Sequence, residues 1–249
     1  MHPVVYYIIV FLGIGAGGMA VANRKVSLQV RQTRWLKYFT YIIFTGIVII
    51  GIFYNFFTWL AWLISIMSMV ELLKVNLSKP PKPFSYVISS QLFLLIMATG
   101  FILFSLSFQN SFLLFIYFQV LVFDGFCQIM GQLFGKHALV PAISPTKTWE
   151  GLAGGWGCCV IAAMLAANWI SIPVSTSVVF GVLTGATSFI GDILASYYKR
   201  LTGIKDYSNW LPGQGGFLDR FDSLLCSAAI YYLLYITTFK QGFDSFVKE

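Results

Sequence analysis

The segment from Ser188 to Leu225 combines acidic, basic and glycine residues inside an otherwise apolar chain. Its charged residues are Asp192, Lys199, Arg200, Lys205, Asp206, Asp219, Arg220 and Asp222. Because charged side chains are costly near a bilayer, such a cluster is by default the hypothesis for a functional site. On a helix, Asp192, Ser196 and Lys199 would share one face, since they are four and three residues apart.

Three of these carboxylates suggest a metal site. Asp219 and Asp222 are three residues apart, so they would lie in one helical turn and could converge with Asp192 on a divalent cation. Mg²⁺ is the expected ion, because it binds one or two carboxylates together with water and substrate phosphates. The pattern leaves room for a second cation.

Glycines and cations in the same segment indicate a phosphate ligand. Three glycines would let the backbone approach an anion at the start of a helix: Gly213, Gly215 and Gly216. Four cations could neutralise a triphosphate: Lys199, Arg200, Lys205 and Arg220. These parts suit phosphoryl or nucleotidyl transfer, which depends on positioning and electrostatics. The alternative is an interfacial loop whose charges pair with one another.

A second group of candidates precedes this segment. Asp124 lies within an apolar run with Gln128 one turn later on the same face, which favours function over a partnered structural Asp. In the loop that follows, candidate phosphate contacts are Lys136, Ser144 and Lys147. The stretch from Ser144 to Glu150 is typical of a turn that caps the next helix. An ordinary basic loop with an interfacial Trp149 fits equally well, and His137 is expected to be a loop residue.

Composition predicts an integral membrane protein. The 249 residues are 58% hydrophobic and only 10% charged, and the mean hydropathy is +0.79. Soluble domains carry about 25% charged residues, which excludes a soluble globular domain. The net charge of +7 fits loops that contact anionic lipid headgroups. Nucleic acid is not an expected partner, because no basic helix or strand stands outside the apolar runs.

Eight apolar runs are long enough to span a bilayer, which predicts an all-α polytopic fold. The runs are 4–22, 38–54, 57–73, 86–107, 112–134, 152–170, 174–198 and 221–239. We expect one integral membrane domain over 1–249, with N-terminal spans in 1–110 and catalytic spans and cytoplasmic loops in 111–249. The first run is expected to be a retained helix rather than a cleaved signal peptide.

Lysine and arginine residues fall in alternate loops, after the first, third, fifth and seventh runs. The positive-inside rule puts these loops, and all the candidate chemistry, in the cytoplasm and both termini outside. A bacterial inner membrane is the expected location.

The spacings of Gly13 with Gly17 and of Gly151 with Gly155 predict close helix packing, within the chain or in a homodimer. The G-x-G-x-x-G pattern in the first run lacks the strand that a dinucleotide site needs.

Two long motifs resemble one enzyme family. The first motif reads Ser196, Lys199-Arg200, Lys205-Asp206, Pro212-Gly213-Gln214-Gly215-Gly216, Asp219-Arg220 and Asp222. The second reads Asp124, Gly131, Phe134-Gly135-Lys136-His137, and Ser144 through Gly151. In order and spacing they resemble the phosphatidate cytidylyltransferase (CDP-diacylglycerol synthase) family. The N-terminal half resembles the family only as a set of apolar spans.

The resemblance implies an all-helical membrane enzyme that joins CTP to phosphatidic acid and gives CDP-diacylglycerol and pyrophosphate. It implies that Asp192 and Asp219, with Asp222 next, bind the metal. Phosphates would be held by Lys199, Arg200, Lys205 and Arg220. Asp206 would orient one of those cations, and from the second motif Lys147 would contact a further phosphate while Asp124 lines a polar cavity.

Three positions depart from the family pattern. Gln214 stands where the family has His, Ala195 where a Glu is common, and Gln128 where an aromatic residue is usual. Gln cannot transfer protons near neutral pH as His can, so these changes suit either a divergent paralogue with another lipid acceptor or a weaker enzyme. Two other functions are alternatives to cytidylyl transfer: a CTP-dependent polyprenol or phytol kinase, and a lipid-binding or transport protein. A transporter is disfavoured because no internal repeat is visible and the charges gather at one membrane face.

Overall fold

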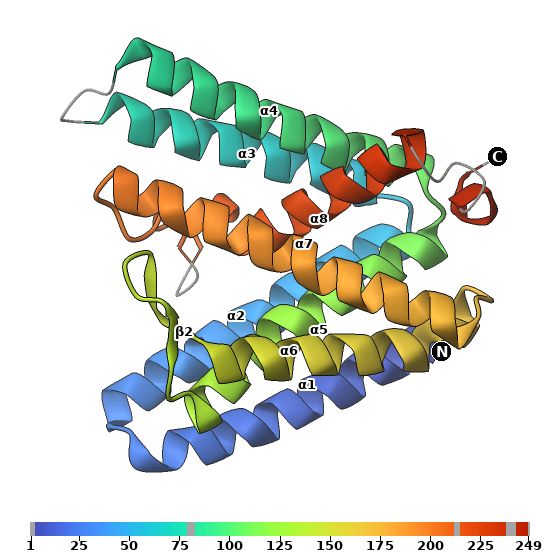
Figure 1. Cartoon of the computed structure of the whole chain (residues 1–249), viewed down its shortest axis with the longest axis horizontal. Coiled ribbons are helices and arrows are strands. Elements are labelled where there is room, and N and C mark those ends of the chain that lie inside the picture. The colour runs from blue at the N-terminus through green and yellow to red at the C-terminus, as the bar shows by residue number, and fades with distance from the viewer. Residues whose placement is uncertain (1–2, 79–82, 212–214, 238–242, 249) are drawn as a thin grey trace.

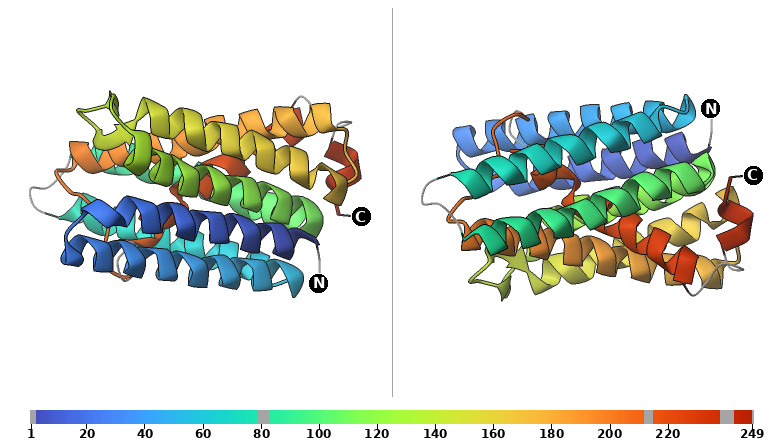
Figure 2. Two further views of the ribbon diagram at one scale, coloured as in Figure 1. Left: turned by 90° about the horizontal axis from the view of Figure 1, so that it is seen from below. Right: turned by 90° about the horizontal axis from the view of Figure 1, so that it is seen from above.

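The computed structural model describes residues 3–78, 83–211, 215–237 and 243–248. Within these residues, eight long helices form almost the whole molecule (Figure 1). They are α1 (Pro3–Ala22), α2 (Leu28–Phe53), α3 (Phe57–Leu77), α4 (Phe84–Ser107), α5 (Asn110–Phe134), α6 (Trp149–Ala166), α7 (Val174–Leu201) and α8 (Phe217–Thr237). The predicted all-α architecture is confirmed. Figure 2 shows the helices lying side by side along one long axis.

Seven helices of the described chain, α1 to α7, are long and apolar enough to cross a membrane. The eighth predicted span exists as α8, but α8 is not among them. It begins at Phe217 rather than at residue 221, so its first two turns include Asp219, Arg220 and Asp222. Most of α8 is buried against α3, α4, α5 and α7. The charged start of α8 is therefore sheltered inside the bundle and not presented to lipid.

Helix α2 begins ten residues before the predicted span at 38–54. The stretch that precedes the span was expected to be a basic loop, but Arg31, Arg34 and Lys37 lie on the helix. Arg, Lys, Gln and Leu are all good helix formers, and neither Pro nor Gly occurs between Leu28 and the apolar part. The helix therefore continues beyond the apolar residues and carries cations at its N-terminal end.

The loop between α5 and α6 contains a small hairpin that the sequence did not predict. Strand β1 (Ala138–Val140) pairs antiparallel with β2 (Ser144–Thr148). The hairpin was missed because its strands are short and lack an alternating apolar pattern. The turn expected over Ser144 to Glu150 is wrong, because Ser144–Thr148 is strand β2 and α6 begins at Trp149. The expected helix cap is confirmed, because the Thr148 hydroxyl accepts the N–H of Gly151 at 3.1 Å.

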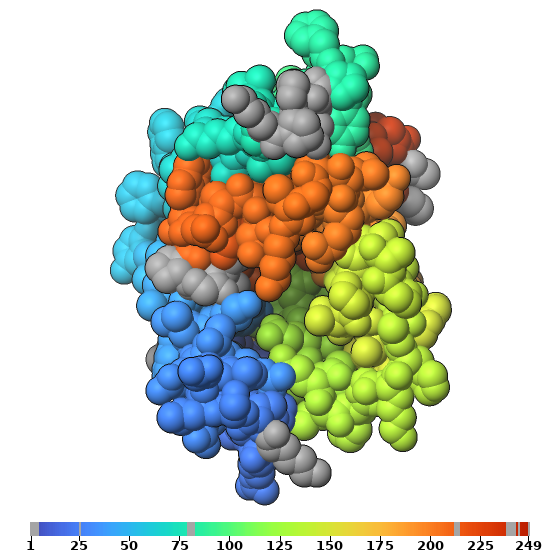
Figure 3. All heavy atoms as spheres, turned by 90° about the vertical axis from the view of Figure 1, so that its left-hand side faces the viewer, coloured from blue at the N-terminus to red at the C-terminus, as the bar shows by residue number. Residues whose placement is uncertain are grey.

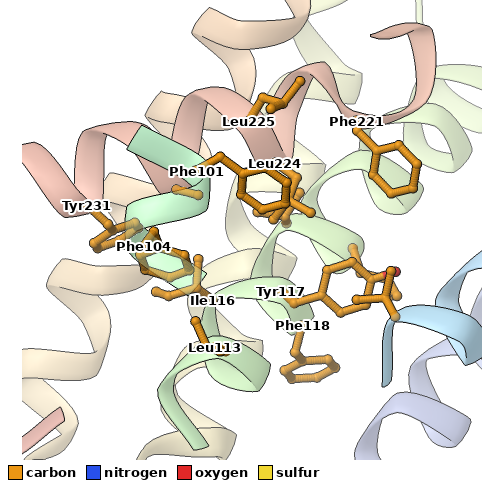
Figure 4. Close-up of a cluster of buried hydrophobic side chains, with 14 of the residues drawn as sticks. Phe101, Phe104, Leu113, Ile116, Tyr117, Phe118, Phe221, Leu224, Leu225 and Tyr231 are labelled. Carbon is orange, nitrogen blue, oxygen red and sulfur yellow. The ribbon is translucent and has the colours of Figure 1, made fainter. Parts of the chain in front are cut away.

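Helix α5 is the centre of the bundle, since 78% of its span is buried, against 22–44% for the other six candidate spans. Figure 4 shows that Ile116 lies near Phe104 of α4, whereas Phe118 points away from α4 and α8. The ring of Phe118 contacts Phe11 of α1 and Trp169. The largest fully buried side chains include Phe101 and Phe104 from α4 and Tyr231 from α8. This apolar core fixes α5 and α8 against each other and so fixes the polar ends of both helices.

Glycines let α6 and α1 approach α5 closely. A Cβ at Gly155 would lie 2.2 Å from the Cys127 sulfur of α5, which confirms the packing predicted for the α6 glycines. Gly13 and Gly17 do not pack closely within the chain, because nothing lies within 4 Å of a Cβ at either position, and their packing in a homodimer stays a prediction. The close contact of α1 is instead at Gly18, where a Cβ would be 2.7 Å from the Ile129 side chain. Spacing alone could not tell which face of α1 meets α5.

Substitution of Gly155 by Ala is expected to lower the melting temperature in detergent by several degrees. The added methyl group cannot fit beside Cys127, and overpacking of this kind costs about 1–3 kcal/mol. Gly157→Ala is the matched control on the same helix, since nothing lies within 4 Å of a Cβ there. It is expected to be neutral or to stabilise by about 0.5–1 kcal/mol. Equal melting temperatures for the two variants would contradict the close packing.

Candidate active site

A polar cavity of about 790 Å³ opens where α2, α5, α7, α8 and the hairpin meet. Figure 3 shows this end of the molecule, which is hollowed between the α1–α2 end, the end of α7 and the hairpin region. The charged residues on its wall are Arg34, Lys37, Asp124, Lys147, Asp192, Lys205, Asp219, Arg220 and Asp222. Ser144 and Gln128 also line it. The cavity thus joins residues of both sequence motifs, as predicted.

Asp192 connects the two motifs directly. Its Oδ2 atom is 2.7 Å from Nζ of Lys147, which extends from the hairpin. The Ser196 hydroxyl donates to Asp192 Oδ1 at 3.4 Å, so the predicted shared helical face is confirmed. Asp124 and Asp222 line the same cavity as Asp192. Three carboxylates from α5, α7 and α8 therefore converge on one side of the cavity.

Asp219 has both of its oxygens bonded by protein donors. Nζ of Lys199 is 2.7 Å from Oδ1, and the backbone N–H groups of Tyr207 and Gly216 donate to Oδ2 at 2.7 and 2.9 Å. The side chains of this ion pair are only 12% and 4% exposed. Asp219 therefore ties the end of α7, the following loop and the start of α8 together.

Tyr207 completes this junction. Its hydroxyl donates to the carbonyl of Ala195 at 3.1 Å, and its ring lies 5.6 Å from the Lys199 ammonium. Burial, with the nearby Asp222 and Asp219 carboxylates, raises the pKa of the Tyr207 hydroxyl, which stays protonated as a donor.

The four predicted phosphate cations separate into two pairs. Lys205 and Arg220 line the cavity. Lys199 is engaged by Asp219, and Arg200 donates from Nε to the carbonyl of Ile143 at 2.8 Å, which fastens the hairpin to α7. In this structure Lys199 and Arg200 organise the walls of the site and do not line the cavity.

The remaining predicted residues fall around this centre. Lys136 does not line the cavity, and its backbone N–H donates to Glu150 at 3.1 Å. Asp206 is exposed in the loop after α7 and does not line the cavity either. Gly215 and Gly216 lead into α8, whereas Gly213 and Gln214 lie outside the described residues.

Ala195 lies on the other side of α7. It lines a separate, mostly apolar pocket of about 320 Å³ between α4, α7 and α8. Ala195 does not line the polar cavity, although Asp222 lines both the cavity and this pocket.

Asp124 is held at the α5–α8 contact. The Ser223 hydroxyl donates to its Oδ1 at 3.0 Å. Close by, the Arg220 guanidinium lies 4.3 Å from the ring centre of Tyr41, whose hydroxyl donates to a carbonyl of α5. A cation over an aromatic ring is stabilised by the ring quadrupole, so Tyr41 positions Arg220 on the cavity wall.

Sequence reasoning missed Glu71 of α3, which is fully buried. Its Oε1 accepts the Ser208 hydroxyl at 2.6 Å and the N–H of Phe217 at 2.9 Å, and its Oε2 accepts the N–H of Leu218 at 2.9 Å. Glu71 thus caps α8, and Asp219 also receives a donor there. The first N–H groups of α8, expected to receive a ligand anion, are bonded to protein carboxylates. A Glu inside an apolar run was the available signal.

The donor set in the cavity is compatible with Mg²⁺. Among the described residues no group of three or more His, Cys, Asp or Glu side chains is arranged as a ready metal site. Mg²⁺ needs only one or two carboxylates, with water and substrate phosphates as the other ligands. Asp192 and Asp222 line the cavity and meet this requirement. As a ligand, Asp219 would first have to release Lys199, so the Mg²⁺ site stays a prediction.

Comparison with known proteins identifies the family. Part of the chain is 42% identical over 106 residues to the phosphatidate cytidylyltransferase of Mycobacterium bovis, covering 42% of this chain and 35% of that protein. The enzyme of the same name from Haemophilus influenzae is 36% identical over 132 residues, 49% of this chain and 45% of that protein. The enzyme of the same name from Aquifex aeolicus is 36% identical over 126 residues, which cover 51% of this chain and 48% of that protein.

The matched segment spans less than half the length of each of these relatives. A sequence model described as the cytidylyltransferase family matches residues 3–238, which is nearly the whole chain. The first four helices, which carry neither motif, are therefore part of the match. The chain belongs to the cytidylyltransferase family.

Proposed function

We propose that this protein is a phosphatidate cytidylyltransferase, which transfers CMP from CTP to phosphatidic acid. The observation that carries the proposal is the polar cavity in which carboxylates of α5, α7 and α8 face cations of both motifs. Curated relatives of the matched segment bear that name. A triphosphate nucleotide and a phosphorylated lipid both need such a cationic cavity at the membrane.

In the proposed reaction, an oxygen of the phosphatidate phosphate attacks the α-phosphorus of CTP. The bond from that phosphorus to the oxygen bridging the α- and β-phosphates breaks, and pyrophosphate leaves with the electron pair. The products are CDP-diacylglycerol and pyrophosphate. The protein's own part is electrostatic, because Lys147, Lys205 and Arg220 lie where phosphate charge must be held.

Asp192 and Asp222 are the residues we propose to hold Mg²⁺. When bound, this ion would offset the charge of the phosphates and orient them. Asp192 also fixes the Lys147 ammonium, so it organises a phosphate contact whether or not the metal is present. Ser196 and Ser223 position the carboxylates of Asp192 and Asp124 through the hydrogen bonds described above.

We propose that the cavity faces the cytoplasm of a bacterial inner membrane. The seven apolar helices indicate an integral membrane protein. The N-terminal end of α2, the hairpin and the end of α7 lie at the end of the bundle where the basic residues gather, and Figure 1 shows these segments at its left-hand side. Cytoplasmic loops carry such an excess of Lys and Arg.

The proposal is tested by incubating the purified protein with phosphatidic acid and Mg²⁺, using CTP labelled at either the α- or the γ-phosphorus. Cytidylyl transfer puts the α-label into extracted lipid and leaves the γ-label in pyrophosphate. Label from the γ-position in lipid would instead identify a CTP-dependent kinase. No label in lipid from either position, with a protein that still binds CTP, would overturn phosphatidic acid as the acceptor. Label from the α-position would also show that Gln214 replaces the family's His without loss of the reaction.

Replacement of Asp192 by Asn is expected to lower kcat by at least about 100-fold, the effect of removing one charged group from a preorganised site. The variant loses the ion pair with Lys147 and a proposed metal ligand. Ser188→Ala is a suitable control because Ser188 lies on the same helix, bonds Ser227 and does not line the cavity. Equal turnover by the two variants would contradict the role given to Asp192.

A further inference from the structure

The N-terminal part of α2 forms a wall of the polar cavity. Gln29, Thr33 and Lys37 recur every four residues, and Val30 and Arg34 lie beside them on the same lining face. One turn further along, Tyr41 supports Arg220 from the same helix. One face of α2 therefore lines the cavity and, one turn later, contacts Arg220 through Tyr41.

The two motifs supply three of the cations that line the cavity: Lys147, Lys205 and Arg220. Lys199 and Arg200, which the motif assigned to phosphates, are engaged by Asp219 and by the Ile143 carbonyl. Lys147 is held by Asp192. Five cations line the cavity, and two of the five, Arg34 and Lys37, come from α2. Because the proposed substrates bring both a triphosphate and a lipid phosphate, the α2 cations are well placed to offset part of that charge.

Arg34 is the better placed of the two for a defined contact. Its side chain is partly buried, and its Nη1 atom donates to Oδ1 of Asn23 at 3.2 Å. Asn23 lies in the turn after α1 and is only 2% exposed, so this hydrogen bond anchors the guanidinium to a buried side chain. This bond uses one of five N–H donors, and the planar fork of an arginine matches two phosphate oxygens at once.

We propose that Arg34, with Lys37 beside it, is a phosphate-binding residue of the site. The proposal rests on the proposed function, since that function supplies the phosphates. The ligand is a phosphate group carried either by CTP, as its triphosphate, or by the phosphatidate headgroup. Both would enter the same cavity, and kinetics with each substrate varied in turn distinguishes them.

The test compares Arg34→Met and Arg34→Lys with Arg31→Met. Arg31 is the matched control, because it lies on the same helix, is exposed and does not line the cavity. Arg34→Met is expected to raise KM about 10- to 100-fold for one substrate, the loss of a charge-assisted hydrogen bond. Arg34→Lys is expected to recover only part of the loss, because a lysine keeps the charge without the fork. A rise in KM for CTP assigns the residue to the nucleotide, and a rise for phosphatidic acid assigns it to the lipid.

A second measurement does not depend on turnover. Inorganic pyrophosphate is added to each purified variant, and the shift in melting temperature is recorded. Pyrophosphate is expected to stabilise the wild type and Arg31→Met and to have a clearly smaller effect on Arg34→Met. Equal stabilisation of all three, together with unchanged KM values for both substrates, would overturn the assignment. An inactive wild type that is still stabilised through Arg34 would overturn the proposed function and leave the phosphate site standing.

Discussion

Replacement of Asp219 by Asn is expected to abolish measurable turnover and to destabilise the protein. The Lys199 ammonium would remain buried without its carboxylate, and breaking one side of such a pair costs about 3–5 kcal/mol. The amide nitrogen of Asn can also take the place of an oxygen that accepts the N–H groups of Tyr207 and Gly216. The start of α8 would then shift, and Asp222 with it.

Turnover alone cannot distinguish a metal ligand from a structural anchor at this position. The double variant Asp219→Asn with Lys199→Met separates the two roles, because it removes the unpaired charge together with the carboxylate. We expect it to recover much of the melting temperature lost by Asp219→Asn. If Asp219 only anchors the junction, the apparent affinity for Mg²⁺ in any residual activity is unchanged. A double variant as unstable as the single one would contradict the ion pair as the main contribution of Asp219.

The fold followed from the sequence to a large extent, because lipid imposes a simple rule. Every apolar run of sufficient length had to become a helix, since backbone groups in hydrocarbon need internal hydrogen bonds. The differences lie where that rule does not apply. The amphipathic extension of α2 and the polar start of α8 are helical for reasons of propensity and capping, and no hydropathy pattern marks their limits.

The site was predictable in its membership and less so in its roles. Spacing placed Asp192 and Ser196 on one face, and the structure confirms it. Spacing could not show which charges of the motif would pair, as Lys199 does with Asp219 across a loop. It also could not show that Arg200 would bond the hairpin, which precedes it by more than 50 residues. Arg34 was read as one of many basic loop residues, since only the tertiary packing of α2 brings it to the cavity.

Glu71 is another residue whose role could not be predicted from the sequence. It carries a charge in an apolar run, yet it lies more than 100 residues before the first motif, and nothing in its neighbouring sequence indicates a partner. The structure supplies that partner as the N-terminus of α8, where the helix dipole favours a carboxylate. A residue of the N-terminal half thus positions the part of the first motif that lies at the start of α8. Glu71 is a positioning residue rather than a catalytic one.

Removal of this cap by Glu71→Ala is expected to have the second largest effect. The N–H groups of Phe217 and Leu218 would be left buried without an acceptor, at a cost of about 1–3 kcal/mol for each group. Glu71→Gln keeps the shape of the side chain, but one of its two atoms would be an amide donor facing another donor. Both variants are therefore expected to melt at lower temperature than the wild type, with Glu71→Ala the lower.

The effect on turnover follows from what the cap holds in place. Asp219 and Asp222 lie in the first two turns of α8, so a loosened helix start is expected to lower kcat more than it raises KM for either substrate. Ser68→Ala is the matched control, because Ser68 is one turn earlier on α3 and equally buried but does not contact α8's first N–H groups. If Glu71→Ala had the same melting temperature and the same kcat as Ser68→Ala, the idea that the cap supports the site would be contradicted. Partial recovery of kcat in Glu71→Asp, relative to Glu71→Ala, would support the role of the cap, because a shorter carboxylate can still accept a hydrogen bond from one of the two N–H groups.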